Sequence, residues 1–125
     1  MTSAPSSPPV PTWQVICLCA AWCGVCREWD EVFEALGHVF PEASLAWVDV
    51  EDEADALGDV DIETFPTLLV AHDGRACFFG PVQPSQSQVA RLLDSLLEDP
   101  HAVRSVPAEA HPLLHRLQPL VLPKR

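Results

Sequence analysis

The spacing of apolar residues changes several times along the middle of the chain. Each spacing is typical of a strand or of a helix, so the pattern predicts the secondary structure. Residues 14–21 are almost continuously apolar, which is typical of a strand buried on both faces at the centre of a sheet. Between residues 23 and 40, apolar side chains recur every three or four positions with acidic ones between them, which predicts an amphipathic helix. Apolar segments at 44–50 and 65–71 predict two more strands, and 52–57 a brief helix between them.

The second half of the pattern predicts a hairpin and another helix. Asp73-Gly74 is typical of a two-residue hairpin turn, and 76–79 is then the antiparallel partner of the third strand. Ser85 stands three residues before Gln88, a capping-box pattern, and leucines at one-face spacing follow it. We therefore expect a helix that ends near residue 98. The order strand, helix, strand, short helix, strand, strand, helix indicates one α/β domain.

The two ends of the chain differ from this core in composition. Residues 1–13 are rich in Pro and Ser and have no hydrophobic period, so we expect a disordered arm before a domain at 14–98. Residues 99–125 form a Pro- and Leu-rich extension that is too apolar for an ordinary solvated tail. Its prolines, Pro112 among them, argue against one long helix. We expect this extension to pack on the exposed side of the core or on a partner.

The net charge of −11 restricts the partners of the protein. It repels phosphate backbones and anionic lipid surfaces, so we expect neither nucleic acid nor membrane as a partner. Eight acidic residues at positions 49–63 are either a solvated face or a patch that steers basic partners. Residues 1–14 hold no Lys or Arg, unlike a secretory signal peptide, and the apolar run at 15–21 falls short of the ~20 residues that span a bilayer. We expect a cytoplasmic protein.

The chemistry of the chain centres on Cys23 and Cys26, which lie where the first strand gives way to the first helix. Two thiols at this spacing close a small disulfide ring, and the positive end of the helix favours thiolate at the first sulfur. Cys23 is therefore the expected nucleophile, and Cys26 the thiol that resolves the mixed disulfide. In a reducing compartment, five cysteines indicate a catalytic or metal-binding pair instead of a disulfide framework.

A metal site is the main alternative for these cysteines. Cys17 and Cys19 precede the pair closely, and together with Cys23 and Cys26 they make four thiols within ten residues. Both should point to the same face of a buried strand, into the core and away from the helix start, which makes tetrahedral closure difficult. His111 and His115 have a metal-like spacing, but Pro112 should interrupt the helix that would align them. We expect no bound metal and no cofactor.

Two motifs together resemble the thioredoxin family: Trp22-Cys23-Gly24-Val25-Cys26, and Phe65-Pro66-Thr67 directly before a strand. The resemblance covers about residues 14–98. It implies a three-layer α/β fold with a mixed central sheet, here without the first strand and helix of full thioredoxins. That additional strand covers the strand expected at 44–50, so its loss leaves an open sheet edge.

The resemblance also implies a substrate groove. Trp22, Gly24 and Val25 would line it, Phe65 would offer backbone hydrogen bonds to an extended substrate, and Pro66, in a cis peptide, would form its wall and exclude metal. Gly80 would leave room for entry of the substrate. The implied partners are protein disulfides and a thioredoxin reductase or another dithiol donor.

Two departures from the family pattern concern the dithiol. Val25 stands where typical thioredoxins have proline, which frees an N–H that can donate to sulfur. This donor stabilises the reduced form and predicts a less negative potential than that of a typical thioredoxin. Cys17 aligns with the usual buried aspartate and Trp47 with its lysine partner, so proton transfer from Cys26 would fall to water, Glu28 or Asp30. Cys17 itself is either a small buried hydrophobe or a site of regulatory oxidation.

These observations leave two functional hypotheses. The first is a thiol–disulfide oxidoreductase in which Cys23 and Cys26 exchange electrons with a restricted set of protein substrates. The second is a thioredoxin-fold interaction module with weak or no turnover, which the missing acid and the apolar extension favour. Turnover with a thioredoxin reductase, or co-purification of a stoichiometric partner, distinguishes them.

Overall fold

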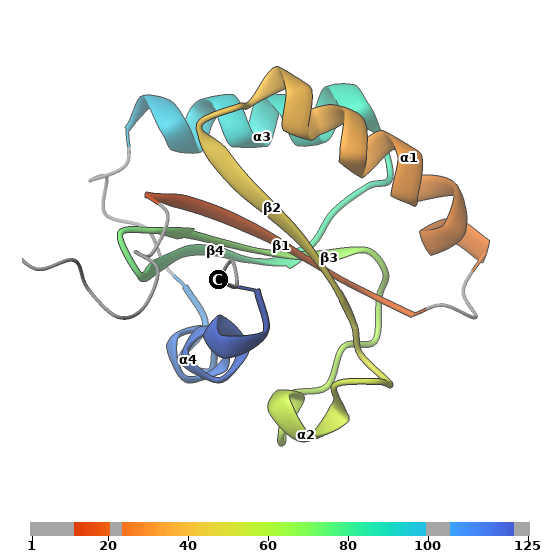
Figure 1. The fold of residues 1–125 in the computed structure, drawn as a ribbon, viewed down its shortest axis with the longest axis vertical. Helices are drawn as coiled ribbons and strands as arrows, with labels where there is room; N and C mark the ends of the chain where they lie inside the picture. The colour runs from red at the N-terminus through yellow and green to blue at the C-terminus, as the bar shows by residue number, and fades with distance from the viewer. Residues whose placement is uncertain (1–11, 21–23, 100–105, 122–125) are drawn as a thin grey trace, which may run out of the picture.

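The computed structural model describes residues 12–20, 24–99 and 106–121, and in it a four-stranded sheet lies between two layers of helices (Figure 1). The sheet has the strand order β2-β1-β3-β4. Helices α1 and α3 cover one face, and α4 and the short α2 lie on the other (Figure 1). The bounds are β1 Trp13–Cys19, α1 Gly24–Val39, β2 Ala43–Asp49, α2 Ala54–Leu57, β3 Thr67–His72, β4 Arg75–Pro81, α3 Gln86–Glu98 and α4 Ala110–Val121.

Strand β1 is the centre of the molecule. It pairs with β2 in parallel and with β3 in antiparallel, and all seven of its residues are buried. Successive side chains of a strand point to opposite faces, so β1 contributes to two separate cores. Val15, Cys17 and Cys19 pack with α1 and α3, whereas Ile16 and Leu18 pack with α4. The continuous apolar run therefore predicted a doubly covered strand correctly.

The local signals of the second half are also confirmed. Asp73 and Gly74 both have positive φ, 52° and 80°, as a two-residue turn between β3 and β4 requires. Helix α3 begins after Ser85, whose hydroxyl accepts a hydrogen bond from the Gln88 backbone N–H at 3.4 Å. Among the described residues no strand pairs with the outer side of β2, which is an edge of the sheet.

The C-terminal extension corrects one expectation. Residues 110–121 form a single twelve-residue helix, α4, although Pro112 was expected to interrupt the helix that carries His111 and His115. Pro112 is the third residue of α4, a position whose N–H has no partner within the helix, so it costs no hydrogen bond. Pro119 lies near the other end. The buried side chains of α4 are Ala110, Leu113, Leu114 and Leu117.

Polar contacts also hold α4 on the core. Gln118 and Gln14 exchange two side-chain hydrogen bonds, at 3.0 and 3.1 Å. The guanidinium group of Arg116 donates to the carbonyls of Ala56 at 2.6 Å and Leu57 at 3.0 Å, at the end of α2. Gly58 follows there with a φ of +61°, which favours glycine.

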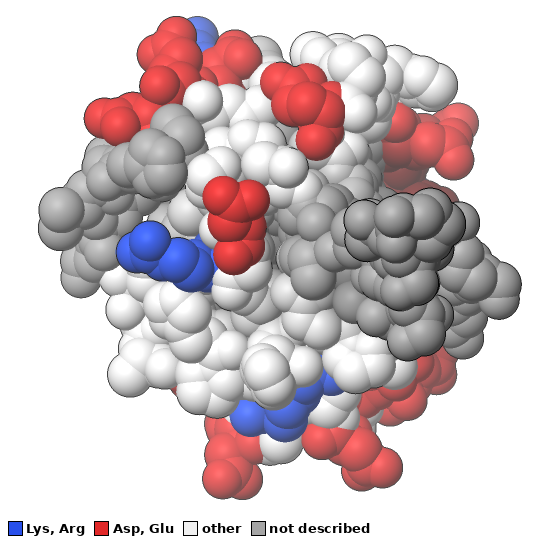
Figure 2. Space-filling view, turned by 60° about the vertical axis from the view of Figure 1, so that its left-hand side comes forward, with Lys and Arg blue, Asp and Glu red and all other residues white. Residues whose placement is uncertain are grey.

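Two further expectations concern the acidic stretch and the histidines. The acidic side chains between 49 and 63 are half-buried or exposed, as expected for a solvated face. Figure 2 shows acidic groups at several separate places on one side of the molecule, with few basic ones. His111 is exposed, and its Nε2 accepts a hydrogen bond from the Ala76 N–H at 3.2 Å. Within the described ranges, no helix is long and apolar enough to cross a membrane.

Candidate functional site

The candidate site lies at the carboxyl end of β1, where α1 begins. Cys26 is in the first turn of α1 and its side chain is fully buried. Gly24 and Val25 precede it at the start of the helix, and both are exposed. Trp22 and Cys23 lie outside the described residues, so the position of the expected nucleophile stays a prediction. The structure thus places the resolving half of the expected pair at the positive end of a sixteen-residue helix.

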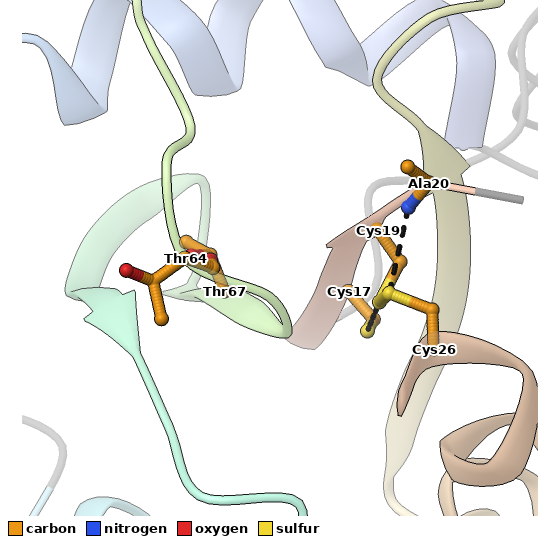
Figure 3. Close-up of a disulfide and its surroundings, with 6 residues drawn as sticks. All are labelled: Cys17, Cys19, Ala20, Cys26, Thr64 and Thr67. Atoms are coloured by element: carbon orange, nitrogen blue, oxygen red, sulfur yellow. Dashed lines mark hydrogen bonds between the residues drawn. A yellow bond between two sulfur atoms is a disulfide. The ribbon is translucent and has the colours of Figure 1, made fainter. Parts of the chain in front are cut away.

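A disulfide joins Cys26 to Cys19, the last residue of β1 (Figure 3). The argument that Cys17 and Cys19 would point away from the helix start is therefore wrong. Both do point into the core, but α1 is itself the element that covers this face of the sheet. A side chain at the end of β1 consequently meets the first turn of α1. The sequence signal for this contact was the strand register of Cys19, which places it on the face of Cys17.

Two groups contact the sulfur atoms of this disulfide. The backbone N–H of Ala20 donates to Cys26 Sγ at 3.5 Å, and the thiol of Cys17 lies 4.0 Å from Cys19 Sγ (Figure 3). Cys17 is fully buried and belongs to no disulfide. An N–H or S–H that points at sulfur stabilises negative charge there, so both sulfur atoms have a donor when the disulfide opens.

The thiol of Cys17 is held in its protonated form. Its pKa is raised from 9.0 to about 12, mainly because burial disfavours the thiolate; the Trp29 side chain opposes this rise in part, and the negative charge of Asp30 adds to it. The Trp29 indole N–H is buried and has no hydrogen-bond partner of good geometry among the described residues. The resemblance places Cys17 where typical thioredoxins carry a carboxylate, but a thiol with this pKa does not accept a proton at neutral pH.

The loop before β3 lies at the same end of the sheet as the disulfide. The peptide bond between Phe65 and Pro66 is cis, and Pro66 is buried. Thr67 follows as the first residue of β3 and pairs with Leu18, one residue before Cys19. Its hydroxyl donates to the Thr64 carbonyl at 2.7 Å, which closes the loop opposite the disulfide (Figure 3).

A shallow pocket of about 210 Å³ adjoins this loop. Gly80 of β4 is on its wall, and Phe65 is half-buried against the core that holds Cys26. The pocket is bordered by the acidic residues Asp61 and Glu63. In the described part of the chain no group of His, Cys, Asp or Glu is arranged to hold a metal ion. The expected groove residues that are described therefore surround one end of the sheet.

Comparison with known proteins also identifies relatives of this chain among the thioredoxins. The thioredoxin family model matches residues 12–95. Over 57 residues the chain is 40% identical to a thioredoxin H-type protein of Picea mariana, covering 46% of each chain. Over 75 residues it is 29% identical to a putative thioredoxin 2 of Streptomyces coelicolor, covering 60% of this chain and 54% of that one. The chain thus spans about half the length of these relatives.

Solved structures match over a larger share. The X-ray structure of Fasciola hepatica thioredoxin superposes with a TM-score of 0.61 and 25% identity, covering 68% of this chain and 81% of that one. Thioredoxin from Trypanosoma brucei brucei gives a TM-score of 0.62 at 20% identity, covering 71% and 78%. The sheet order, the buried Cys26 at the start of α1 and the family match over two thirds of the sequence agree, and the chain belongs to the thioredoxin family.

Proposed function

We propose that the protein is a thiol–disulfide oxidoreductase that acts on protein disulfides through Cys23 and Cys26. The Cys23 thiolate attacks a substrate disulfide and forms a mixed disulfide. The Cys26 thiolate then attacks Cys23 Sγ, which releases the reduced substrate and leaves a Cys23–Cys26 disulfide. Two electrons pass from the dithiol to the substrate in each turnover.

The observation that carries this proposal is the position of Cys26. It is fully buried in the first turn of α1 and accepts a backbone N–H at 3.5 Å. A buried sulfur with a donor suits a resolving thiol, because it meets only a partner sulfur delivered from within the protein. The loop of cis Pro66 lies at the same end of the sheet and offers the wall for an extended substrate.

The way in which Cys26 loses its proton is a reason to propose a restricted set of substrates. Cys17 stands at the place of the usual carboxylate and stays protonated, so it does not take the proton of Cys26. Asp30 lies one turn of α1 after Cys26 and is exposed, so it or water receives that proton. A less direct proton path slows resolution and favours substrates that remain bound long enough in the groove.

The remaining parts of the proposal concern the surroundings of the reaction. Trp22, Gly24, Val25, Phe65, Pro66 and Gly80 form the substrate groove. A thioredoxin reductase or another dithiol donor regenerates the dithiol, and the cytoplasm is the compartment where such donors act. The acidic residues Asp61 and Glu63 beside the groove favour substrates with basic residues near their disulfide.

The test is turnover with dithiothreitol as the dithiol donor and insulin as the disulfide substrate. We expect wild-type protein to reduce insulin and Cys26→Ser to lose turnover. Reduced Cys26→Ser protein that is mixed with insulin after removal of dithiothreitol should retain a mixed disulfide at Cys23. Cys77→Ser is a matched control, because Cys77 is half-buried on β4 and lies outside the site. A Cys26→Ser protein that reduces insulin at the wild-type rate contradicts the proposal.

One observation favours the alternative of an interaction module. The Cys19–Cys26 disulfide occupies the sulfur atom of Cys26, which turnover needs. A protein that stays in this form would bind a partner protein without exchanging electrons with it. Absence of turnover after full reduction, together with co-purification of a stoichiometric partner by both wild-type and Cys26→Ser protein, would establish this second function.

A further inference from the structure

The partner of Cys26 in the structure lies outside the Cys-x-x-Cys motif. Cys19 ends β1, and its Cα lies 5.9 Å from that of Cys26, a usual separation for a disulfide. Both side chains are fully buried in the core under α1 and α3. In the structure Cys26 is therefore bonded to Cys19 of the sheet, whereas the proposed reaction requires it to bond with Cys23.

The surroundings of Cys19 allow it to exchange disulfides. The Cys17 thiol lies 4.0 Å from Cys19 Sγ as a donor, and the Ala20 N–H donates to Cys26 Sγ. A disulfide exchanges only when one of its sulfur atoms leaves as a thiolate, and nearby donors stabilise that thiolate. Each sulfur of the Cys19–Cys26 pair therefore has a group that supports it as attacking or leaving atom.

We propose that Cys19 is a second redox partner of Cys26 and that the Cys19–Cys26 disulfide is an oxidised, inactive form of the enzyme. This inference rests on the function proposed above. The Cys19 thiolate attacks Cys26 Sγ of the Cys23–Cys26 disulfide, so that the Cys19–Cys26 bond forms and the Cys23–Cys26 bond breaks. Cys23 leaves as a thiolate and takes up the proton that Cys19 lost, so the step has no net oxidation. The reverse attack by Cys23 restores the active pair.

The burial of both sulfur atoms determines how the Cys19–Cys26 form can be reduced. External thiols such as glutathione do not reach two sulfur atoms that are fully buried, so they do not reduce the Cys19–Cys26 bond directly. Cys26 is meanwhile unable to resolve a mixed disulfide. Oxidised protein in this form therefore starts turnover slowly, and its activity depends on the exchange back to Cys23.

The first experiment maps the disulfides of the wild-type full chain. The protein is equilibrated in glutathione buffers of increasing oxidised fraction, its free thiols are alkylated under acidic denaturing conditions, and it is digested without reduction. Cleavage after Trp22 and after Arg27 separates Cys19 from the peptide 23–27. A Cys19–Cys26 bond then gives two linked peptides with Cys23 alkylated, whereas a Cys23–Cys26 bond lies within one peptide. We expect the linked pair to predominate in oxidised protein.

The second experiment measures the start of turnover in variants. We expect oxidised wild-type protein to begin insulin reduction about tenfold more slowly than reduced protein. Cys19→Ala should remove this lag, because only the Cys23–Cys26 bond can form. Cys77→Ala is the control: Cys77 is half-buried on β4 and belongs to no disulfide, so its lag should remain. If Cys19→Ala does not fold, the wild-type map alone decides.

The outcomes separate this inference from the proposed function. A wild-type map with only the Cys23–Cys26 bond at every glutathione ratio overturns the role of Cys19 and leaves the oxidoreductase intact. A Cys19–Cys26 bond with no Cys23 linkage in any variant, and no turnover by Cys19→Ala, overturns both and makes the bond a structural crosslink. Linked peptides together with a lag that only Cys19→Ala removes support the inference.

Discussion

The two faces of the sheet are built from the same strands but differ in the residues that they hold and in the helices that cover them. The face under α1 and α3 lies within the residues that match the family, and it holds Cys17, Cys19 and Cys26. The opposite face is covered by α4, which comes after the matched residues and contributes only apolar side chains to its core. Cys17, Cys19 and Cys26 thus lie on one side of β1, and α4 completes the burial of the other side.

This difference explains why an apolar extension follows the family core. An apolar sheet face must be buried, and among the described residues α4 and the short α2 are the helices on this face. Helix α4 supplies a cover with leucines and then fixes it by the hydrogen bonds of Arg116 and Gln118. Among the described residues no strand pairs with the outer side of β2, so α4 supplies a layer of the fold and not a strand.

Removing residues 107–125 should have the largest effect on stability, because it uncovers the sheet face that α4 buries. The deletion exposes Ile16, Leu18 and Leu69, which are fully buried, so we expect aggregation or loss of the cooperative unfolding transition. Thermal denaturation and size-exclusion chromatography measure this. An unchanged melting temperature and an unchanged oligomeric state would mean that α4 does not stabilise this face.

Cys17 tests whether every sulfur on the α1–α3 face is reactive. With a pKa of about 12, only about one Cys17 in a thousand is a thiolate at pH 9, and burial blocks access besides. We expect iodoacetamide to leave Cys17 unlabelled in native protein at that pH and to label it after unfolding in urea. The labelled fraction should rise with pH, because the thiolate increases tenfold per unit. Native labelling as fast as in urea would contradict this prediction.

Leu113→Ala measures how much the α4 core contributes. Leu113 is fully buried against the sheet, so its truncation should lower the free energy of unfolding by about 2–5 kcal/mol. Leu120→Ala on the same helix is the control, since that side chain is 44% exposed and should cost under about 0.5 kcal/mol. Urea denaturation of both variants gives the values. Equal losses would show that α4 does not bury one particular face, and insulin reduction should be preserved in both.

Val25→Pro tests the redox energetics on the opposite face. Val25 is the second residue of α1, where proline is compatible with the helix but removes an N–H donor near the dithiol. We expect the redox potential to become more negative by about 30 mV, equivalent to about 1.4 kcal/mol. Titration against glutathione measures this. Val25→Ala keeps the N–H and should retain the wild-type potential, and a shift of the same size in that variant would assign the effect to the side chain.

Arg116→Lys should have the smallest effect. Lysine keeps the charge but cannot donate to both the Ala56 and Leu57 carbonyls in the geometry of a guanidinium group. We expect a loss of about 1 kcal/mol in the free energy of unfolding, because these hydrogen bonds are partly exposed to water. Denaturation in urea gives this value, and turnover should stay unchanged. A turnover defect would show that the α4 face is coupled to the site.

The sequence predicted most of the fold because the signals were local. The continuous apolar run of β1, the Asp73-Gly74 turn and the Ser85 cap each act within a few residues, and each is found where expected. Pro112 misled the prediction of α4 for a related reason. Whether proline breaks a helix depends on its distance from the helix start, and no local signal placed that start at Ala110.

By itself, then, the sequence determined the order of elements up to α3, the family and the presence of a cysteine in the first turn of α1. These follow from periodicity and from motifs whose meaning is contained in neighbouring residues. Only the tertiary structure decided that Cys19 bonds to Cys26, that Cys17 stays protonated beside it and that α4 covers the second face. Each of these depends on which helix packs on which side of β1, a long-range contact that the one-dimensional pattern leaves open.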